Sequence, residues 1–523
     1  MIDGEMQAFA LTLDRFLEHA AKWRPDVEVI TAGEGGAIDR AGYAELRQRS
    51  LRASAVLATL GVRKGDRVAT LAWNTRAHVE TWYAIMGMGA VCHTLNPRLT
   101  EAQLASMVAQ SQARILIASA DLASLARRVA ARTASLDRVL TIDGPANGPS
   151  TDALEPMIAE AVADGVWGQF DEAAPSGLCF TSGTTGAPKG VTYTHRSSFL
   201  HTLRLLQADV MAITAADTVL AAVPMFHANA WGLPFAAPAA GARLVLPGRD
   251  LDGASLARLI NAESVTVAVG IATLWLGLVE HLDATGGATP TLERVIVGGA
   301  PMAPALMDRI EQRLGVSVQT SWGMTELSPL GTCAPPRDPA RTAQVSGRPA
   351  FGVDLLLTDA DGVALPEQRG VEGHLRVRGA AVVERYFGDA SSATDAEGWF
   401  PTGDLARIDV DGDLVITGRA KDLIKSGGEW INPAEIEAVI NEHPSVSLAA
   451  VIGRPDPKWG ERPVLVIQPR EMQDATDEDI LSPLRGRVAP WWIPDAVIRL
   501  EQMPLASTGK IDKMRLRVDY GGC

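Results

Sequence analysis

Residues 177–190 read Gly-Leu-Cys-Phe-Thr-Ser-Gly-Thr-Thr-Gly-Ala-Pro-Lys-Gly, an apolar segment that runs into a loop of hydroxyl residues and glycines. Its glycines would let backbone N–H groups approach phosphate oxygens, while four hydroxyls add donors and Lys189 adds a positive charge. The loop is not a Walker A motif, because Gly190 follows the lysine where that motif has Ser or Thr. From composition alone, this stretch could also be an ordinary Ser/Thr/Gly surface turn. The Pro-Lys-Gly sequence at its end favours a phosphate-binding loop.

The sequence on both sides of this loop alternates between helical and strand patterns. Residues 13–23 have helical apolar spacing with Thr12 as a candidate N-cap, and further helices are expected at 101–110 and from Pro304. Short apolar runs predict buried strands at 67–72, 114–118, 218–223, 264–269 and 292–297. Such alternation predicts an α/β fold with mixed, largely parallel sheets flanked by helices.

The pattern changes from about Asp354 onwards. Short strands at 354–357, 373–377 and 414–416 alternate with Asp-Gly turns, which predicts a small antiparallel β unit. A compact α+β pattern follows, with helices expected at 433–441 and 478–488 and strands at 446–452 and 464–467. We therefore predict a large N-terminal domain, residues 1–419, and a small mobile C-terminal domain, residues 420–523.

Composition excludes several classes of protein. The 523 residues are 47% apolar and 21% charged, and the formal net charge of −14 disfavours nucleic acid as a partner. Four widely spaced cysteines disfavour a zinc cluster or a disulfide framework and fit a reducing cytoplasm. The acidic start is unlike a signal peptide, and prolines interrupt the apolar stretch 220–246, so no transmembrane segment is expected.

The loop and a set of motifs in a fixed order resemble the adenylate-forming superfamily of acyl-CoA synthetases, luciferases and peptide-synthetase adenylation domains. The resemblance covers nearly the whole chain. The motifs are Thr181–Gly190, Pro-Met-Phe-His-Ala-Asn-Ala-Trp-Gly at 224–232, Val-Gly-Gly-Ala-Pro at 297–301, Ser-Trp-Gly-Met-Thr-Glu at 321–326, Trp-Phe-Pro-Thr-Gly-Asp at 399–404, the segment 416–429 and Ser-Thr-Gly-Lys at 507–510.

The resemblance implies an ATP site and a magnesium ligand. Trp322 would stack on adenine, Thr325 would touch the α-phosphate region and Glu326 would help to hold Mg²⁺, a cation that prefers oxygen ligands. The family more often has Tyr at the position of Trp322, which leaves open any contact that a tyrosine hydroxyl would make. The predicted ATP-binding residues are Thr181, Ser182, Gly183, Thr184, Thr185, Gly299, Ala300, Pro301, Ser321, Trp322, Gly323, Met324, Asp404, Ile416 and Arg419.

Within this set, Asp404 matches the aspartate that binds the ribose hydroxyls, and Arg419 matches an arginine that reaches the ribose or a phosphate. A turn-forming Asp without a ligand is the alternative for Asp404.

Lys510 matches the family's catalytic lysine, carried by the mobile domain. The resemblance implies that it bridges the substrate carboxylate and the α-phosphate, while Mg²⁺ and Lys189 assist the departure of pyrophosphate. Lys421 falls at the hinge, where a backbone rotation would exchange two domain poses. The second pose would present a CoA-binding segment, for which an ordinary hairpin surface is the alternative: Lys425, Gly427, Gly428, Glu429 and Trp430.

The acyl site is expected among apolar segments. No Asp or Glu lies between Pro224 and Pro234 to pair with an amino group, so an amino acid substrate is disfavoured. His227 would shape or gate the site rather than act as a base, because a carboxylate nucleophile needs no deprotonation at pH 7. The predicted acyl-binding residues are His227, Ala228, Asn229, Trp231, Ile271, Trp275 and Gly298.

These features predict an AMP-forming acid–CoA ligase that takes an apolar monocarboxylic acid, with Mg²⁺ as cofactor and ATP and CoA as co-substrates. The stretches Trp73-Asn74 and 93–98 resemble the branch of medium- and long-chain fatty acyl-CoA and methylmercaptopropionate-CoA ligases. The acid could equally be a medium- or long-chain fatty acid, a short thioether acid or an aryl acid. The alternatives are a non-CoA acyl acceptor or a non-catalytic nucleotide-binding homologue. A homodimer is an expectation from family analogy alone.

Overall fold

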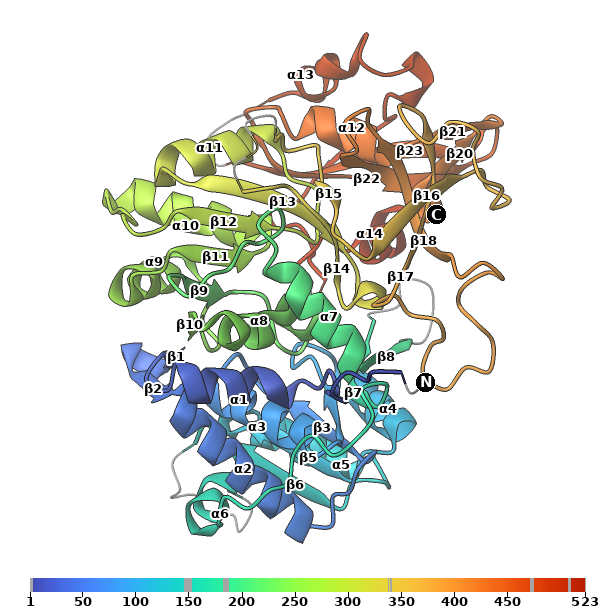
Figure 1. The fold of residues 1–523 in the computed structure, drawn as a ribbon. Helices are drawn as coiled ribbons and strands as arrows, with labels where there is room; N and C mark the ends of the chain where they lie inside the picture. The colour runs from blue at the N-terminus through green and yellow to red at the C-terminus, as the bar shows by residue number, and fades with distance from the viewer. Residues whose placement is uncertain are drawn as a thin grey trace.

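The computed structural model describes residues 3–144, 153–181, 188–336, 338, 341–470, 475–506 and 509–522. In these residues, four β-sheets and the helices around them form the fold (Figure 1). The helices are α1 Asp14–Trp23, α2 Tyr43–Thr59, α3 Arg76–Gly87, α4 Glu101–Ser111, α5 Ala123–Ala131, α6 Leu154–Glu160, α7 His195–Leu205, α8 Leu233–Ala240, α9 Gly253–Glu263, α10 Ala272–Thr285, α11 Pro304–Leu314, α12 Pro433–Ile440, α13 Asp477–Leu481 and α14 Lys513–Tyr520.

The strand that leads into the phosphate-loop motif belongs to a six-stranded sheet. Its strand order is β6 (Arg138–Ile142), β5 (Ile115–Ser119), β3 (Arg67–Leu71), β4 (Val91–Thr94), β7 (Pro175–Phe180) and β8 (Gly190–Thr194). All neighbours pair in parallel except β7 and β8, which are antiparallel. The loop therefore connects the two arms of a hairpin at one edge of a parallel sheet.

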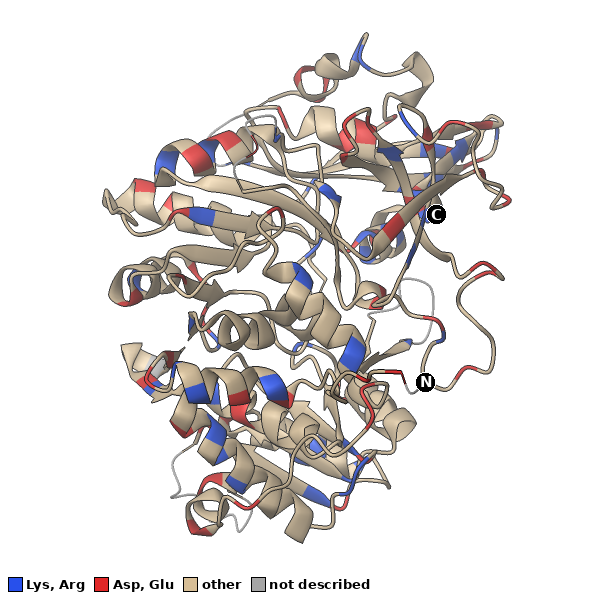
Figure 2. Ribbon diagram, viewed as in Figure 1, with Lys and Arg blue, Asp and Glu red and all other residues tan. Residues whose placement is uncertain are grey.

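A second sheet of nine strands carries most of the other motifs. Its order is β15 (Arg348–Pro349), β14 (Leu330–Cys333), β13 (Ser317–Gly323), β12 (Arg294–Val297), β11 (Val267–Gly270), β9 (Thr218–Ala221), β10 (Arg243–Leu246), β1 (Glu28–Ala32) and β2 (Ile38–Gly42). The stretch from β13 to β1 is parallel. Its central strands are mostly apolar because helices cover both faces of the sheet. Figure 2 shows charged residues mainly on the outer helices and loops.

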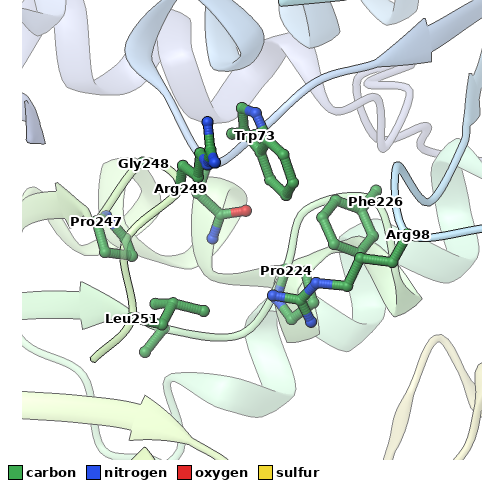
Figure 3. A pocket seen from close by; sticks show the side chains of 10 residues that line it. Trp73, Arg98, Pro224, Phe226, Pro247, Gly248, Arg249 and Leu251 are labelled. Carbon is green, nitrogen blue, oxygen red and sulfur yellow. The ribbon is translucent and has the colours of Figure 1, made fainter. Parts of the chain in front are cut away.

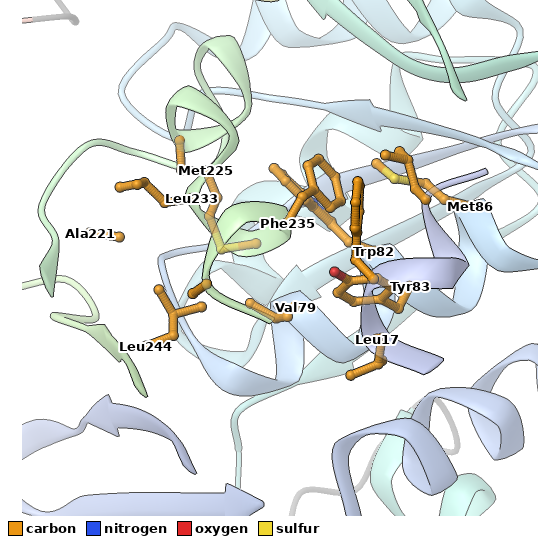
Figure 4. Packing of buried hydrophobic residues seen from close by; sticks show 14 of the residues in the cluster. Leu17, Val79, Trp82, Tyr83, Met86, Ala221, Met225, Leu233, Phe235 and Leu244 are labelled. Atoms are coloured by element: carbon orange, nitrogen blue, oxygen red, sulfur yellow. The ribbon is translucent and has the colours of Figure 1, made fainter. Parts of the chain in front are cut away.

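A buried aromatic cluster joins the two sheets. Trp82 and Tyr83 of α3 pack against Phe235 of α8, and Leu17 of α1 lies in the same cluster (Figure 4). The Tyr83 hydroxyl also donates a hydrogen bond to the Pro234 carbonyl oxygen at 3.0 Å. These contacts, each between residues far apart in the sequence, hold the loops of both sheets at fixed positions relative to one another.

Two smaller β units complete the chain, the first an antiparallel sheet and the second a mixed one. The first is a four-stranded sheet of β16 (Val353–Thr358), β17 (Glu372–Gly379), β18 (Phe400–Ile408) and β19 (Leu414–Arg419). The second consists of β20 (Ile424–Ser426), β21 (Glu429–Ile431), β22 (Val446–Asp456), β23 (Gly460–Pro469) and β24 (Val497–Arg499), packed with α12 and α14. The α/β class with a smaller α+β unit at the C-terminal end is confirmed. The proposed limits at residues 419 and 420 fall between β19 and β20, and the domain division itself stays a prediction.

Two local predictions are wrong. The helix expected at 478–488 ends at Leu481 and continues only as a short 3₁₀ turn, Ser482–Leu484, because Pro483 has no backbone N–H to donate and Gly486 adopts φ 77°. Helix α1 begins at Asp14 with Leu13, not Thr12, at the N-cap. The apolar stretch 220–246 forms β9, α8 and β10, and no helix in the described part of the chain is long and apolar enough to cross a bilayer.

Candidate functional site

The motif residues gather where strands of the two parallel sheets end. Thr181 follows β7, the segment 224–232 follows β9, Ile271 follows β11, Gly298 follows β12, and residues 321–326 lie at the end of β13. The carboxyl ends of parallel strands are where α/β folds bind ligands, since the loops that leave these ends diverge and form a crevice. The fold thus brings together motifs that are separated by up to about 150 residues.

The phosphate-loop motif is closed by a backbone hydrogen bond from Thr181 N to the Lys189 carbonyl oxygen, 2.9 Å long. The Lys189 ammonium is solvent-exposed and lies 4.7 Å from the centroid of the Tyr386 ring. The predicted ATP ligands Ser182, Gly183, Thr184 and Thr185 lie outside the described residues. Lys189 therefore places one exposed positive charge next to Tyr386.

The buried carboxylate of Glu326 lies near this lysine. Its Oε1 accepts a hydrogen bond from the Tyr386 hydroxyl at 2.9 Å, and the Thr325 carbonyl oxygen accepts one from Tyr193 at 2.8 Å. Burial raises the pKa of Glu326, while Tyr386, Arg419 and Lys189 oppose that shift. Tyr386 was not foreseen from the sequence, because it comes from the turn between β17 and β18 and belongs to no motif.

Glu326 fits a magnesium ligand. It supplies hard carboxylate oxygens, and no cluster of three or more His, Cys, Asp or Glu residues that could enclose a metal occurs among the described residues. Mg²⁺ is commonly held by one or two carboxylates together with substrate phosphates and water. A single carboxylate beside a phosphate loop matches that mode, in which the nucleotide brings most of the oxygen ligands.

Asp404 is held from both sides. Arg419 Nε lies 2.8 Å from its Oδ1, and the indole nitrogen of Trp322 donates to its Oδ2 at 3.0 Å. Only 2% of Asp404 is exposed, and burial raises its pKa, while Arg419 and then Trp322 oppose that shift. The carboxylate keeps free lone pairs that can accept two further hydroxyl donors. The neighbouring Ile416 lies on β19, the strand paired with β18.

Lys510 reaches this cluster from the C-terminal part of the chain. Its Cε lies 3.7 Å from the position that a β-carbon on Gly299 would occupy. The residue as a whole is open to solvent, yet protein atoms crowd its ammonium group, and this burial lowers its pKa. The neighbouring Arg419 and Lys421 charges act in the same direction, and Asp404 opposes them. The structure therefore places Lys510 beside Gly299, near Asp404 and Arg419.

The segment at the end of β12 that is predicted to line the adenine pocket is partly exposed. Gly299 has φ 83°, a conformation that favours glycine, and Ala300 and Pro301 are exposed. Ser321 links this segment to the next strand, because its hydroxyl donates to the Val297 carbonyl oxygen at 2.9 Å. Gly323 and Met324 follow in the same turn, where Met324 N donates to the Pro329 carbonyl oxygen.

The predicted acyl residues divide into two groups. A β-carbon on Gly298 would lie 2.9 Å from Cη2 of Trp231, and one on Gly299 would lie 3.7 Å from Cγ2 of Ile271, so both side chains lie against the glycine pair at the end of β12. Trp275, in contrast, is 0% exposed and packs under Gly270 in the core. The structure therefore does not bring Trp275 to the surface of the site.

Residues 228–231 have an unusual backbone. Ala228, Asn229, Ala230 and Trp231 all have positive φ, between 45° and 53°, before Gly232 at 79°. Only glycine adopts this region without steric cost, so this left-handed turn must be held by its surroundings. The segment that leads into this turn is fixed by Asn74, which accepts from Met225 N and donates to the Ala221 and Val223 carbonyl oxygens. The turn places Trp231 against Gly298.

His227 precedes the left-handed turn. Burial, with a smaller effect from Lys510, lowers its pKa to about 4, so the ring is neutral at pH 7. Beside it lies a small pocket between the two sheets, lined by Trp73, Arg98, Phe226 and Arg249 among others (Figure 3). The Arg98 guanidinium lies 5.9 Å from the Phe226 ring centroid. The pocket brings the 73–74 and 93–98 stretches next to the predicted acyl segment.

The predicted hinge and CoA segment lie on the C-terminal side. Lys421 is in the 3₁₀ turn Ala420–Asp422, and burial lowers its pKa. The segment with Lys425, Gly427, Gly428, Glu429 and Trp430 forms the β20–β21 hairpin. This hairpin lies at the outside of the molecule in the present pose (Figure 1), and 54% of Trp430 is exposed.

Comparison with known proteins supplies a family for this arrangement. Residues 17–387 match the model described as AMP-binding enzyme, and residues 435–510 match the AMP-binding enzyme C-terminal domain. The chain is 38% identical to the 3-methylmercaptopropionyl-CoA ligase of Ruegeria lacuscaerulensis, over 99% of this chain and 98% of that protein.

Two further matches span the full length. The chain is also 38% identical to the medium-chain-fatty-acid–CoA ligase of Ectopseudomonas oleovorans, over 99% of this chain and 97% of that one. Its fold matches the crystal structure of ATP-bound MatB from Rhodopseudomonas palustris with a TM-score of 0.86 and 26% identity, covering 98% and 99% of the two chains.

Proposed function

The chain belongs to the family of AMP-binding enzymes, and from this premise we propose how its site works as an AMP-forming acid–CoA ligase. The carboxylate of the acid attacks the α-phosphorus of ATP, and the bond to the β-phosphate oxygen breaks to release pyrophosphate. The thiolate of CoA then attacks the acyl carbon of the adenylate, and AMP leaves. The thiol proton passes to solvent, so the products are acyl-CoA, AMP and pyrophosphate.

The observation that carries this proposal is the placement of Lys510 beside Gly299, Asp404 and Arg419. Both reactants of the first step are anions, so positive groups must offset the charge that builds up in the transition state. Lys510 would contact the carboxylate and the α-phosphate oxygens. Asp404, fixed by Trp322 and Arg419, would receive the ribose hydroxyls.

The pyrophosphate side of the site would be served by Lys189 and Glu326. The Lys189 side chain is exposed, so its ammonium could follow the β- and γ-phosphates. Mg²⁺ bound at Glu326 would neutralise phosphate charge. Tyr386 contacts both side chains and would keep the carboxylate oriented when the metal is absent.

The second step would use another domain pose. In the present pose Trp430 and its hairpin face solvent, so CoA cannot be held against the acyl-adenylate by this segment. Rotation at Lys421 would withdraw Lys510 and bring the hairpin to the site. Gly427 and Gly428 would then let the pantetheine arm approach the backbone.

The substrate is an apolar monocarboxylic acid. The curated relatives are named for 3-methylmercaptopropionate and medium-chain fatty acids. The predicted acyl residues Trp231, Ile271 and Gly298 lie together at the end of β12, and none of the three has a charged side chain; the nearby Lys510 is assigned to the reacting carboxylate. Such a lining favours an aliphatic, thioether or aryl tail and disfavours a second carboxylate, which would be buried without a partner. We also infer a cytoplasmic enzyme, because ATP and CoA are needed and the described cysteines Cys92, Cys179 and Cys333 are unpaired.

A panel of acids tests this proposal. The full chain would be assayed with ATP, Mg²⁺ and CoA against hexanoate, dodecanoate, 3-methylmercaptopropionate, benzoate and succinate, with AMP and acyl-CoA measured together. We expect equal amounts of AMP and acyl-CoA with at least one apolar acid. AMP without acyl-CoA would indicate a different acceptor, and a higher kcat/KM for succinate than for hexanoate would contradict the apolar site.

A further inference from the structure

The β20–β21 hairpin is too small to keep its shape alone. It has three residue pairs, Ile424 with Ile431, Lys425 with Trp430 and Ser426 with Glu429. Its turn residues Gly427 and Gly428 have φ values of 60° and 92°, as a two-residue turn with two left-handed positions requires. An isolated two-stranded hairpin is only marginally stable in water. Neighbouring residues must therefore determine its orientation.

Four consecutive residues, Trp459–Arg462, make that contact. Gly427 N donates to the Trp459 carbonyl oxygen at 2.7 Å, and Ser426 pairs with Gly460 in the sheet. Lys425 N donates to Glu461 Oε2 at 3.0 Å. Every residue of the first strand and turn from 425 to 427 is thus attached to this one segment, which we call the hairpin brace.

The Trp459 side chain adds a packing contact at the turn itself. A β-carbon on Gly427 would lie 2.8 Å from Cε3 of the Trp459 ring, closer than any real contact. The ring therefore lies directly against the glycine backbone. Its other neighbour is Lys458, whose ammonium is 4.5 Å from the ring centroid, and 45% of Trp459 remains exposed. A half-exposed tryptophan that fits against a glycine limits how the turn can move.

Arg462 connects the brace to the rest of the C-terminal unit. Its Nη1 donates to Ser426 Oγ at 3.3 Å and to the Trp491 carbonyl oxygen at 2.6 Å. Its Nε and Nη2 form a two-point contact with the Asp495 carboxylate, at 2.9 and 2.7 Å. A planar guanidinium held at two points is a rigid connection. The hairpin is thereby fixed to the segment 491–495 as well as to β23.

We propose that Trp459 and Arg462 are positioning residues for thioester formation, holding the 425–430 hairpin at the orientation in which it meets CoA. This inference rests on the proposed function of the hairpin. In the pose with Lys510 in the site, the hairpin and its brace lie at the outside, so the brace contributes nothing to adenylation (Figure 1). Loosening it would slow only the second half-reaction, since small misplacements of a reacting group cost about 10²-fold in rate.

The test separates the two half-reactions in the full-length enzyme. Acid-dependent exchange of pyrophosphate into ATP reports adenylation, and single-turnover reaction of enzyme-bound acyl-adenylate with saturating CoA reports thioester formation. We expect Trp459→Ala and Arg462→Lys to slow thioester formation about 10-fold to 100-fold with exchange unchanged. Trp459→Phe, which keeps a ring against Gly427, should restore most of the rate. Trp23→Ala is the matched control, because Trp23 is 63% exposed beside a lysine on α1.

A coupling measurement makes the test stricter. Gly427→Ala should slow thioester formation in the wild-type background by collision with Trp459, and less so when Trp459→Ala is already present. Fully independent effects of the two substitutions, an equal loss in both half-reactions, or unchanged thioester formation would each overturn the brace. A wild-type enzyme that forms acyl-adenylate but no acyl-CoA would instead contradict the proposed function.

Discussion

The indole nitrogen of Trp322 lies 3.0 Å from Oδ2 of Asp404, across 82 residues of sequence. The aromatic residue expected beneath adenine and the carboxylate expected at the ribose are therefore one hydrogen-bonded unit. Because Arg419 holds the other oxygen, the carboxylate has a single orientation. A tyrosine at position 322 would carry its polar group at a different place. The hydrogen bond from the ring to Asp404 therefore depends on the tryptophan indole.

Replacing Trp322 by Phe should weaken ATP binding while keeping an aromatic face. A hydrogen bond to a buried charge contributes about 1.5–3 kcal/mol, so we expect KM for ATP to rise about tenfold or more, with a smaller change in kcat. The rise in KM caused by Trp322→Phe should be smaller for 3′-deoxy-ATP, because this nucleotide has one hydroxyl fewer to donate to Asp404. Steady-state kinetics with both nucleotides check this. An unchanged KM for ATP would remove Trp322 from the ribose site.

Replacing Lys510 by Ala should abolish most adenylation and leave ATP binding intact. Loss of one preorganised positive group typically costs about 10²–10³-fold in rate. Pyrophosphate release measures the chemistry, and equilibrium binding of ATP is the control. Normal acid-dependent pyrophosphate release by this variant would exclude Lys510 from the mechanism.

The same residue predicts a pH dependence. Burial, Arg419 and Lys421 lower the pKa of Lys510 below the usual 10.5, and the protonated form is the active one. The kcat/KM for ATP should therefore fall as pH rises, at a pH below that value. Lys510→Arg, which stays protonated, should lack this alkaline limb, and an unchanged limb would assign it to another group.

Replacing Lys421 by Pro should separate the two half-reactions. Lys421 lies in a 3₁₀ turn, whose φ is close to that imposed by proline, so the present pose should persist. Adenylation should be nearly normal, and thioester formation should fall by about two orders of magnitude because the backbone can no longer rotate. Equal loss of both half-reactions would count against a hinge at this position.

Replacing Trp231 by Ala should change which acids are accepted. The indole lies against Gly298 and takes up space in front of β12. Its removal should raise kcat/KM for dodecanoate relative to hexanoate by about tenfold, since a few added methylenes can then be bound. The ratio of the two specificity constants is the measurement. Trp275→Phe, in the core behind the site, should leave that ratio unchanged.

His78 predicts acid sensitivity of the fold. Trp82 Nε1 donates to His78 Nε2 at 3.0 Å, so the buried ring must be neutral, and burial lowers its pKa from 6.5 to about 4. As pH falls from 6.5 to 4, His78 binds a proton in the unfolded chain but stays neutral in the folded protein. Stability is thus lost in that window, at about 1.4 kcal/mol per pH unit at most.

His78→Gln, which can donate and accept without titrating, should flatten this dependence. Urea unfolding midpoints at pH 7.5 and pH 4.5 check it, and the difference between the two should be smaller in the variant. His227→Gln serves as a comparison at the site, where the ring is also neutral at pH 7. An identical pH dependence in wild type and His78→Gln would show that other groups dominate.

The sequence by itself determined most secondary-structure elements and the type of reaction. Runs such as 295–297 are apolar because their strand is buried between helices, and they could be recognised directly from the sequence. The motifs around Lys189, Glu326, Asp404 and Lys510 identified the family, because each depends on residue types at fixed spacing. Two predictions from local sequence were wrong. The N-cap of the first helix is Leu13 and not Thr12, and the helix expected at 478–488 ends at Leu481, ahead of a proline and a glycine.

Only the tertiary structure decided which of these residues touch. Tyr386 contacts Glu326 and Trp322 contacts Asp404 through their side chains, and the Trp459 ring lies against the Gly427 backbone. Trp275 looked like a pocket residue from its apolar segment but faces the core, because the helix turns that side toward β11. Such contacts depend on how sheets and helices pack, and packing brings together residues whose separation along the chain carries no local pattern.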